Sequence, residues 1–137
     1  MTRVASDRSD RFTLNVPSDP AYVATARMFS STVARHFGAG EDEIDDLKLA
    51  VSEACSASMR DGIAPGGVRV TAIHEAPLLW FEVSWPEAGV AGDYAPTPDH
   101  AAAGLGLEIV RALFENAELS RSEGGDAVIR FSLPVSA

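Results

Sequence analysis

The sequence has little cysteine, few basic residues and no long apolar run. Cys55 is the only cysteine, so the chain cannot form an internal disulfide, and a reducing compartment is expected. There are 11 basic residues against 20 acidic ones, and the formal net charge is −9. This balance argues against nucleic-acid binding, which requires clustered Lys and Arg. No apolar run could span a bilayer, and residues 1–11 lack the apolar core of a signal peptide, so we expect a cytoplasmic protein.

What the chain does contain is enough for one compact domain. It has 137 residues, of which 46% are hydrophobic, and its mean hydropathy is +0.03. We expect the domain to cover residues 11–135, preceded by a flexible polar tail at residues 1–10. The three histidines are scattered, without the spacing of a metal site, and no metal ligand is assigned.

Periodicity predicts the secondary structure. Strands are expected at residues 12–16, 68–74, 79–85, 117–121 and 127–133, and helices at residues 20–37, 41–61 and 104–117. Asp19 is placed to cap the first helix, and its core-facing residues are expected to be Val23, Met28, Phe29, Val33 and Phe37. The loop expected at residues 86–103 is long enough to suggest a functional role. The order β-α-α-β-β-loop-α-β-β predicts a two-layer α/β sandwich.

The second expected helix carries two features that bear on chemistry. Glu53 and Ala57 are four residues apart, so their side chains project from one face of the helix. A carboxylate there could act as a general base, or it could be an ordinary solvated helix carboxylate. Cys55 lies among apolar residues, which favours a buried, inert thiol. The acidic start of this helix, residues 41–46, could be a solvated helix end or a docking surface for a basic helix.

A short glycine motif precedes the third expected helix. Gly104-Leu105-Gly106-Leu107 could let backbone amides approach a phosphate at the helix N-terminus. Glycines also mark ordinary loop-to-helix turns, so the motif alone leaves both interpretations open.

Together these segments resemble the GHKL ATPase superfamily, and within it the bacterial anti-sigma-factor serine kinases. The segment Leu47 to Cys55 is similar to the first box of that family, E-x-x-x-N, with Glu53 at the Glu position. The run from Pro98-Asp99 through Gly104-Leu105-Gly106-Leu107 to Val110-Arg111-Ala112-Leu113 is similar to its last glycine box and the helix that follows. The resemblance covers about residues 10–135.

The resemblance implies a Bergerat-type fold with a mixed β-sheet covered by helices on one face. It also implies ATP with Mg²⁺ as cofactor, a sigma factor and an anti-anti-sigma protein as partners, and a homodimer whose surface the sequence does not identify. It assigns Glu53 as the general base, and it assigns the nucleotide contacts to Gly89, Gly104, Leu105, Gly106 and Leu107.

Two boxes of the family pattern contain departures. Ala57 stands where the family has the Asn that holds Mg²⁺, and it offers no oxygen. The box D-x-G-x-G aligns with residues 85–89, where only Gly89 fits and Trp85 replaces the Asp that recognises adenine. An indole only donates hydrogen bonds, so Trp85 cannot replace that acceptor, and its bulk could fill the adenine space.

Three functions follow from this combination. The first is a transcription regulator of the anti-sigma-factor type that binds other proteins and has weakened or lost ATP binding. The second is an active ATP-dependent serine kinase that phosphorylates its antagonist, with Glu53 as base and another group holding Mg²⁺. The third is a small-ligand sensor on the same fold. We favour the first function, and the sequence leaves enzymatic activity open.

Overall fold

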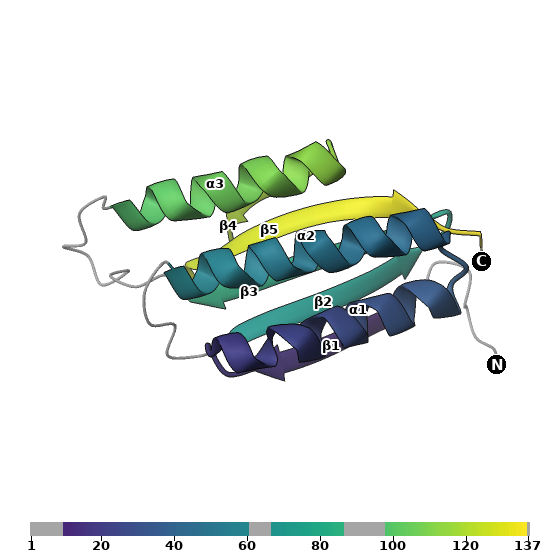
Figure 1. Ribbon diagram of the computed structural model, residues 1–137, viewed down its shortest axis with the longest axis horizontal. Helices are drawn as coiled ribbons and strands as arrows, with labels where there is room; N and C mark the ends of the chain where they lie inside the picture. Colours follow the sequence, from purple (N-terminus) through teal and green to yellow (C-terminus); the bar gives the residue numbers. More distant parts are fainter. Residues whose placement is uncertain (1–9, 61–66, 87–97, 137) are drawn as a thin grey trace.

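The computed structural model describes residues 10–60, 67–86 and 98–136. The elements are β1 (Asp10–Val16), a 3₁₀ helix η2 (Pro20–Tyr22), α1 (Val23–His36), α2 (Glu41–Arg60), β2 (Val68–Glu75), β3 (Leu78–Pro86), α3 (Pro98–Leu113), β4 (Glu118–Arg121) and β5 (Asp126–Pro134). Figure 1 shows α1, α2 and α3 side by side over one face of a single sheet. The predicted two-layer α/β sandwich is therefore confirmed. Among the described residues, no helix combines the length and apolar character needed to cross a membrane.

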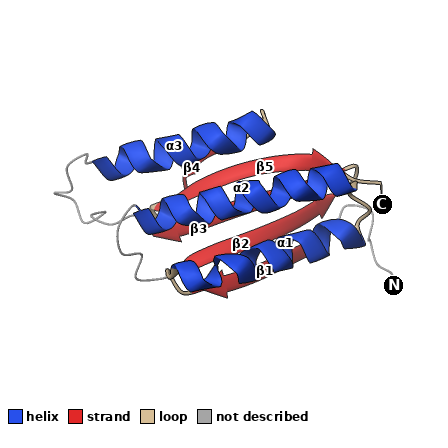
Figure 2. Ribbon diagram, in the orientation of Figure 1, coloured by secondary structure: helices blue, strands red, loops and turns tan. Residues whose placement is uncertain are grey.

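The sheet is antiparallel throughout, so the prediction of a mixed sheet was wrong. Its strand order is β1-β2-β3-β5-β4, and each of the four pairings is antiparallel. The crossover from β3 through α3 leaves β4 running in the same direction as β3, as a single crossover helix does. However, β5 lies between β3 and β4 and separates the two strands that would have formed a parallel pair (Figure 2).

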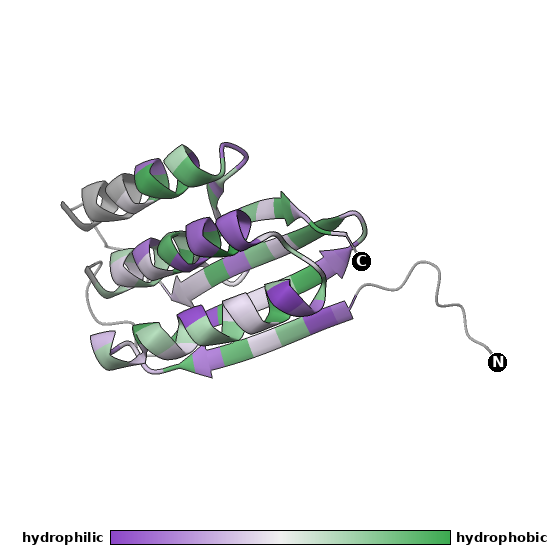
Figure 3. Ribbon diagram, turned by 45° about the vertical axis from the view of Figure 1, so that its right-hand side comes forward, coloured by the Kyte–Doolittle hydropathy of each residue, from purple (hydrophilic) through white to green (hydrophobic). Residues whose placement is uncertain are grey.

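The core lies between the sheet and the helices. Alternate residues of β3 are buried and point toward the helical layer: Leu79, Phe81, Val83 and Trp85. The residues between them are only partly buried and face the open side of the sheet. The same alternation is visible along the strands in Figure 3, where hydrophobic and hydrophilic residues follow one another. This is the pattern of a sheet with one face in the core and one toward solvent.

Helix α2 is the central helix of the layer, between α1 and α3 (Figure 1). Its first turn carries Glu41, Asp42 and Glu43, which suits the positive end of the helix dipole. Its buried residues are Ile44, Leu47, Ala50, Val51, Ala54, Cys55, Ala57 and Ser58. The apolar face predicted for this helix is confirmed.

The predicted helix start at Pro20 is confirmed only as the 3₁₀ helix η2, because α1 itself begins at Val23, and one predicted core residue of α1 is not confirmed. The Asp19 carboxylate accepts a hydrogen bond from the Ala21 amide at 2.9 Å, as expected of a cap. Met28, predicted to face the core, is 69% exposed. It is five residues from Val33, which places it about 140° away around the helix. The residues that face inward are small, Ala26 and Ala34 among them, and this lets α1 approach the sheet closely.

Helix α3 begins at Pro98, not at Gly104, so its predicted start was wrong. It also ends at Leu113, earlier than expected. Proline fits a first helical turn, where its missing amide costs no hydrogen bond. Residues 87–97 of the predicted loop lie outside the described residues, as does the predicted tail except for Asp10, which belongs to β1.

Candidate functional site

The structure places Glu53 and Ala57 on the side of α2 that faces α3. Glu53 is half-buried, whereas Ala57 is fully buried. Gly106 of α3 lies directly against both residues. A Cβ atom added to Gly106 would lie 2.7 Å from the Ala57 Cβ and 3.5 Å from the Glu53 carbonyl oxygen. The two helices therefore meet at the position where the resemblance places the metal-holding Asn.

This contact leaves little space for a longer side chain at position 57. Real Cβ atoms essentially never approach one another to 2.7 Å, so the space beside Ala57 is already taken by the backbone of α3. An Asn side chain at position 57 would have to displace α3 or turn into the packed core. The residue present supplies no oxygen for a cation, so the donor set at this position does not fit Mg²⁺.

Glu53 retains the carboxylate that the predicted chemistry requires. Within the part of the chain that the structure describes, its side chain makes no hydrogen bond or ion pair. The neighbouring Ser52 hydroxyl, by contrast, donates to the Lys48 carbonyl at 2.8 Å and accepts from Arg27 at 3.1 Å. Glu53 is thus available as an acceptor or base, but it sits beside a helix contact.

Trp85 is part of the core. Its side chain is 1% exposed and lies on the helix-facing side of β3, opposite Ala127 of β5. It belongs to the same buried cluster as Ala54 and Leu107, from α2 and α3. The indole therefore occupies the interior between sheet and helices, on the side of the sheet where Glu53 lies.

The four predicted nucleotide contacts that the structure describes lie inside α3, beyond its first turn. Gly104 and Leu105 lie inside α3, six and seven residues after its first residue, so their amides are in the range that intrahelical hydrogen bonds satisfy. Gly106 and Leu107 are buried. Gly89 lies outside the described residues.

Gly106 thus has a packing role that motif reasoning missed. Close approach of two helices requires small residues at the contact, and α2 carries Ala50, Ala54 and Ala57 among its buried positions. This series of small residues was the signal in the sequence that could have indicated a close helix neighbour.

Cys55 is fully buried one turn before Ser58, whose hydroxyl donates to the Cys55 carbonyl. Burial raises the pKa of the Cys55 thiol from 9.0 to about 12, because the interior disfavours the thiolate. The predicted buried thiol is confirmed, and a protonated thiol is a poor nucleophile.

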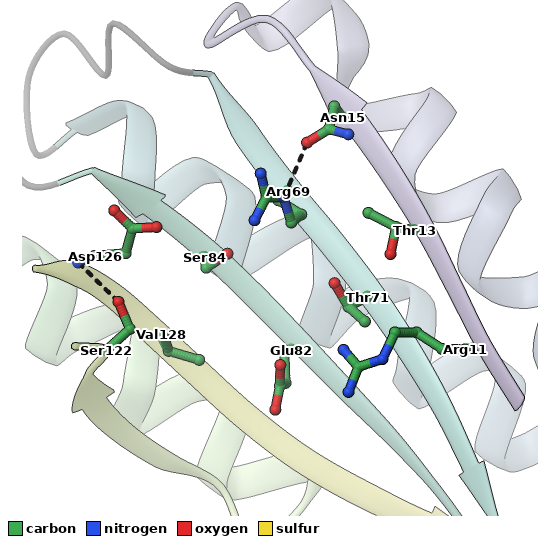
Figure 4. A pocket seen from close by; sticks show the side chains of 10 residues that line it. All are labelled: Arg11, Thr13, Asn15, Arg69, Thr71, Glu82, Ser84, Ser122, Asp126 and Val128. Atoms are coloured by element: carbon green, nitrogen blue, oxygen red, sulfur yellow. Dashed lines mark hydrogen bonds between the residues drawn. The ribbon is translucent and has the colours of Figure 1, made fainter. Parts of the chain in front are cut away.

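A separate polar groove of about 420 Å³ lies on the open face of the sheet (Figure 4). Its lining residues come mainly from β1, β2, β3 and β5: Arg11, Thr13, Asn15, Arg69, Thr71, Glu82, Ser84, Ser122, Asp126 and Val128. Because the helices cover the other face, this groove is on the opposite side of the sheet from Glu53 and Ala57. It is not the site that the sequence predicts.

Known proteins share this sequence pattern. The chain is 28% identical over 137 aligned residues to the serine-protein kinase RsbW of Bacillus subtilis (strain 168), covering 86% of this chain and 82% of that kinase. It is 24% identical over 131 aligned residues to the RsbW of Bacillus cereus (strain G9842), with the same coverage of both chains.

The fold also matches a solved structure, the RsbU and RsbW domains of Rv1364c from Mycobacterium tuberculosis. The TM-score is 0.70 at 16% sequence identity, and the match covers 93% of this chain but only 33% of that longer one. At this identity the likeness establishes the fold. Residues 16–132 match the family model described as the histidine kinase-like ATPase domain. The chain therefore belongs to the histidine kinase-like ATPase family.

Proposed function

We propose that this protein is a cytoplasmic regulator of the anti-sigma-factor type, which binds a sigma factor, an anti-anti-sigma antagonist or both, and whose ATP binding is weakened or lost. One observation supports weakened or lost ATP binding: Ala57 is buried against Gly106 at the position where the family pattern has a metal-holding Asn. The relatives named as RsbW kinases support a regulator of the anti-sigma-factor type.

The size of the expected loss follows from the contacts that are missing. A hydrogen bond to adenine and a metal ligand each contribute about 1.5–3 kcal/mol. Without both, nucleotide affinity falls on the order of 10²- to 10⁴-fold. Trp85 accounts for the first of these losses, because its buried indole offers no acceptor on the helix-facing side of β3.

Partner binding is tested by capture with the tagged chain in its native host, followed by mass spectrometry. We expect a sigma factor or an anti-anti-sigma protein among the captured proteins, and we expect the purified pair to bind equally well with and without Mg-ATP. Recovery of neither class of protein, or binding that requires Mg-ATP, would contradict the proposal.

The alternative is an active serine kinase, and the half-buried carboxylate of Glu53 favours it. Its test is phosphate transfer from labelled ATP to the captured antagonist, comparing the chain with its Glu53→Gln variant. Glutamine keeps the size of the side chain but removes the base. Transfer that is lost in the variant would establish the kinase, whereas no transfer by the unaltered chain would eliminate it.

A further inference from the structure

The polar groove on the open face of the sheet has its charges divided between two pairs of strands. Arg11 of β1 and Arg69 of β2 line one side, and Glu82 of β3 and Asp126 of β5 line the other. Figure 4 shows Arg69 and Asp126 on opposite sides of Ser84. The two arginines and the two carboxylates cancel in formal charge, although the whole chain has a net charge of −9.

The register of the strands fixes this arrangement. Two neighbouring rows of paired residues cross β1, β2 and β3 within the groove: Thr13, Thr71 and Glu82 form one row, and Asn15, Arg69 and Ser84 form the other. Because residues two apart along a strand share a face, both rows project away from the helices. The groove therefore combines hydroxyl and amide groups with separated charges of both signs.

Thr71 supplies a buried polar group that lines this groove. The residue is 5% exposed, and its hydroxyl makes no hydrogen bond to any part of the chain that the structure describes. A buried hydroxyl is normally paired, because leaving it unpaired costs free energy. Its place beside open space indicates a partner that the chain itself does not provide.

Two of the charged side chains are also available to a ligand. With respect to the described residues, the side chains of Arg11 and Asp126 make neither a hydrogen bond nor an ion pair. Arg69 donates from Nε to the Asn15 side-chain oxygen at 3.1 Å, which orients its guanidinium and leaves its other N–H groups for further bonds. Glu82 is different, since Arg130 lies 3.6 Å from its carboxylate and offsets its charge.

This division of charge disfavours ligands of a single sign. An anion drawn to Arg11 and Arg69 would be repelled by Asp126, and a cation drawn to Asp126 would be repelled by the arginines. A ligand that carries a negative group at one end and a positive group at the other is attracted at both ends. The groove is therefore complementary to a zwitterion.

The distance across the groove sets the length of that zwitterion. Arg69 and Asp126 lie on β2 and β5, with β3 between them, so their backbones are about 10 Å apart across the sheet. Side chains stand roughly perpendicular to a sheet, so their charges are separated by a similar distance. The two charged groups of a single amino acid share one carbon and cannot reach both sides. An extended peptide spans about 3.3–3.6 Å per residue, so the ends of two or three residues can.

We propose that the groove binds a short peptide of two or three residues with free termini. Its carboxylate lies at Arg11 and Arg69, its ammonium group lies at Asp126, and its main chain bonds to the hydroxyls of Thr71 and Ser84. The volume of about 420 Å³ is within the range of small-molecule sites. This site is on the face opposite the helices, so it goes beyond the proposed regulatory function and does not depend on it.

Titration of the ¹⁵N-labelled full chain with trialanine, followed by two-dimensional NMR, tests the inference. We expect saturable shifts with a Kd on the order of 1 mM or below, largest for the amides of Thr71 and Ser84. N-acetyl-trialanine lacks the ammonium group and trialanine amide lacks the carboxylate, so each should bind at least about tenfold more weakly, as should free alanine. No saturable shift in the groove, or equal binding by the blocked peptides, would overturn the inference.

Two variants test the orientation of the peptide. Arg69→Gln and Asp126→Asn each remove one charge, and each should weaken trialanine binding at least about tenfold. Asp126→Asn should bind trialanine and N-acetyl-trialanine equally well, because the partner of the ammonium group is gone. The matched controls are Arg35→Gln and Asp45→Asn, which are exposed on the helical layer and should bind like the unaltered chain.

All four variants change side chains at the surface, so each should unfold in urea within about 0.5 kcal/mol of the unaltered chain. Folded Arg69→Gln and Asp126→Asn variants that bind trialanine as tightly as the controls would contradict the proposed site. An Asp126→Asn variant that still prefers trialanine to its N-acetyl form would contradict the proposed position of the ammonium group.

Discussion

Gly106 of α3 and Ala57 of α2 pack so closely that no side chain fits between them. A Cβ atom on Gly106 would lie 2.7 Å from the Ala57 Cβ. The family resemblance places both residues in motifs: Ala57 at the Asn position of the first box and Gly106 in the last glycine box. In this chain the two positions contact each other, and the contact accounts for a small residue at each.

Replacing Gly106 with Ala should destabilise the protein by about 1–2 kcal/mol. Overpacking costs about 1–3 kcal/mol, of which up to about 1 kcal/mol is offset by the better helix propensity of Ala. The free energy of unfolding in urea measures the effect. The second variant, Ala57→Gly, makes room in the Gly106→Ala background, so the double variant should show a favourable coupling of about 1 kcal/mol. Strict additivity of the two changes would contradict the contact.

Replacing Ala57 with Asn should destabilise the protein by about 2–5 kcal/mol and should not restore nucleotide binding. A buried amide without a partner costs about 1–3 kcal/mol, and overpacking against α3 adds to this. The affinity for nucleotide stays low because Trp85 still offers no hydrogen-bond acceptor to adenine. Ser56→Asn, at the half-buried neighbouring position, is the control and should cost less than about 1 kcal/mol. A stable Ala57→Asn variant that binds Mg-ATP tightly would show that the pocket is intact.

Stability should fall at alkaline pH because of Cys55. Its pKa is raised from 9.0 to about 12 in the folded protein, so between these values the unfolded thiol loses its proton while the folded one keeps it. The contribution of the Cys55 thiol to the free energy of unfolding is fully present below pH 9.0 and decreases by about 1.4 kcal/mol per pH unit above it. Urea unfolding should show little effect of Cys55 between pH 8 and 9 and a loss of about 1 kcal/mol between pH 9 and 10, and Cys55→Ala should remove this loss. The same pH dependence of the free energy of unfolding in the unaltered chain and in Cys55→Ala would contradict this prediction.

The sequence predicted the fold where local signals agree with the tertiary structure. The acidic first turn and apolar face of α2 predicted its bounds closely, since both depend on residues within the helix. The start of α3 was missed because glycine is a poor helix former on its own. In the structure, packing against α2 outweighs this propensity at Gly106. Met28 was wrongly assigned to the core. It lies five residues before Val33, and five residues do not make a whole number of helical turns.

The candidate site was predicted only in part, for a similar reason. Glu53, Ala57 and Trp85 could be found by their spacing and their departure from a pattern. The contact of Ala57 with Gly106 joins residues 49 positions apart and depends on how two helices pack, which local periodicity does not contain. The polar groove on the open face likewise depends on the strand order of the whole sheet.

The central claim is that the meeting of α2 and α3 at Ala57 has replaced a nucleotide and cation site. Isothermal titration of the unaltered full chain with Mg-ATP tests it most directly. We expect binding too weak to saturate below about 1 mM, an affinity of no more than about 4 kcal/mol. Saturable binding with a micromolar Kd would contradict the claim.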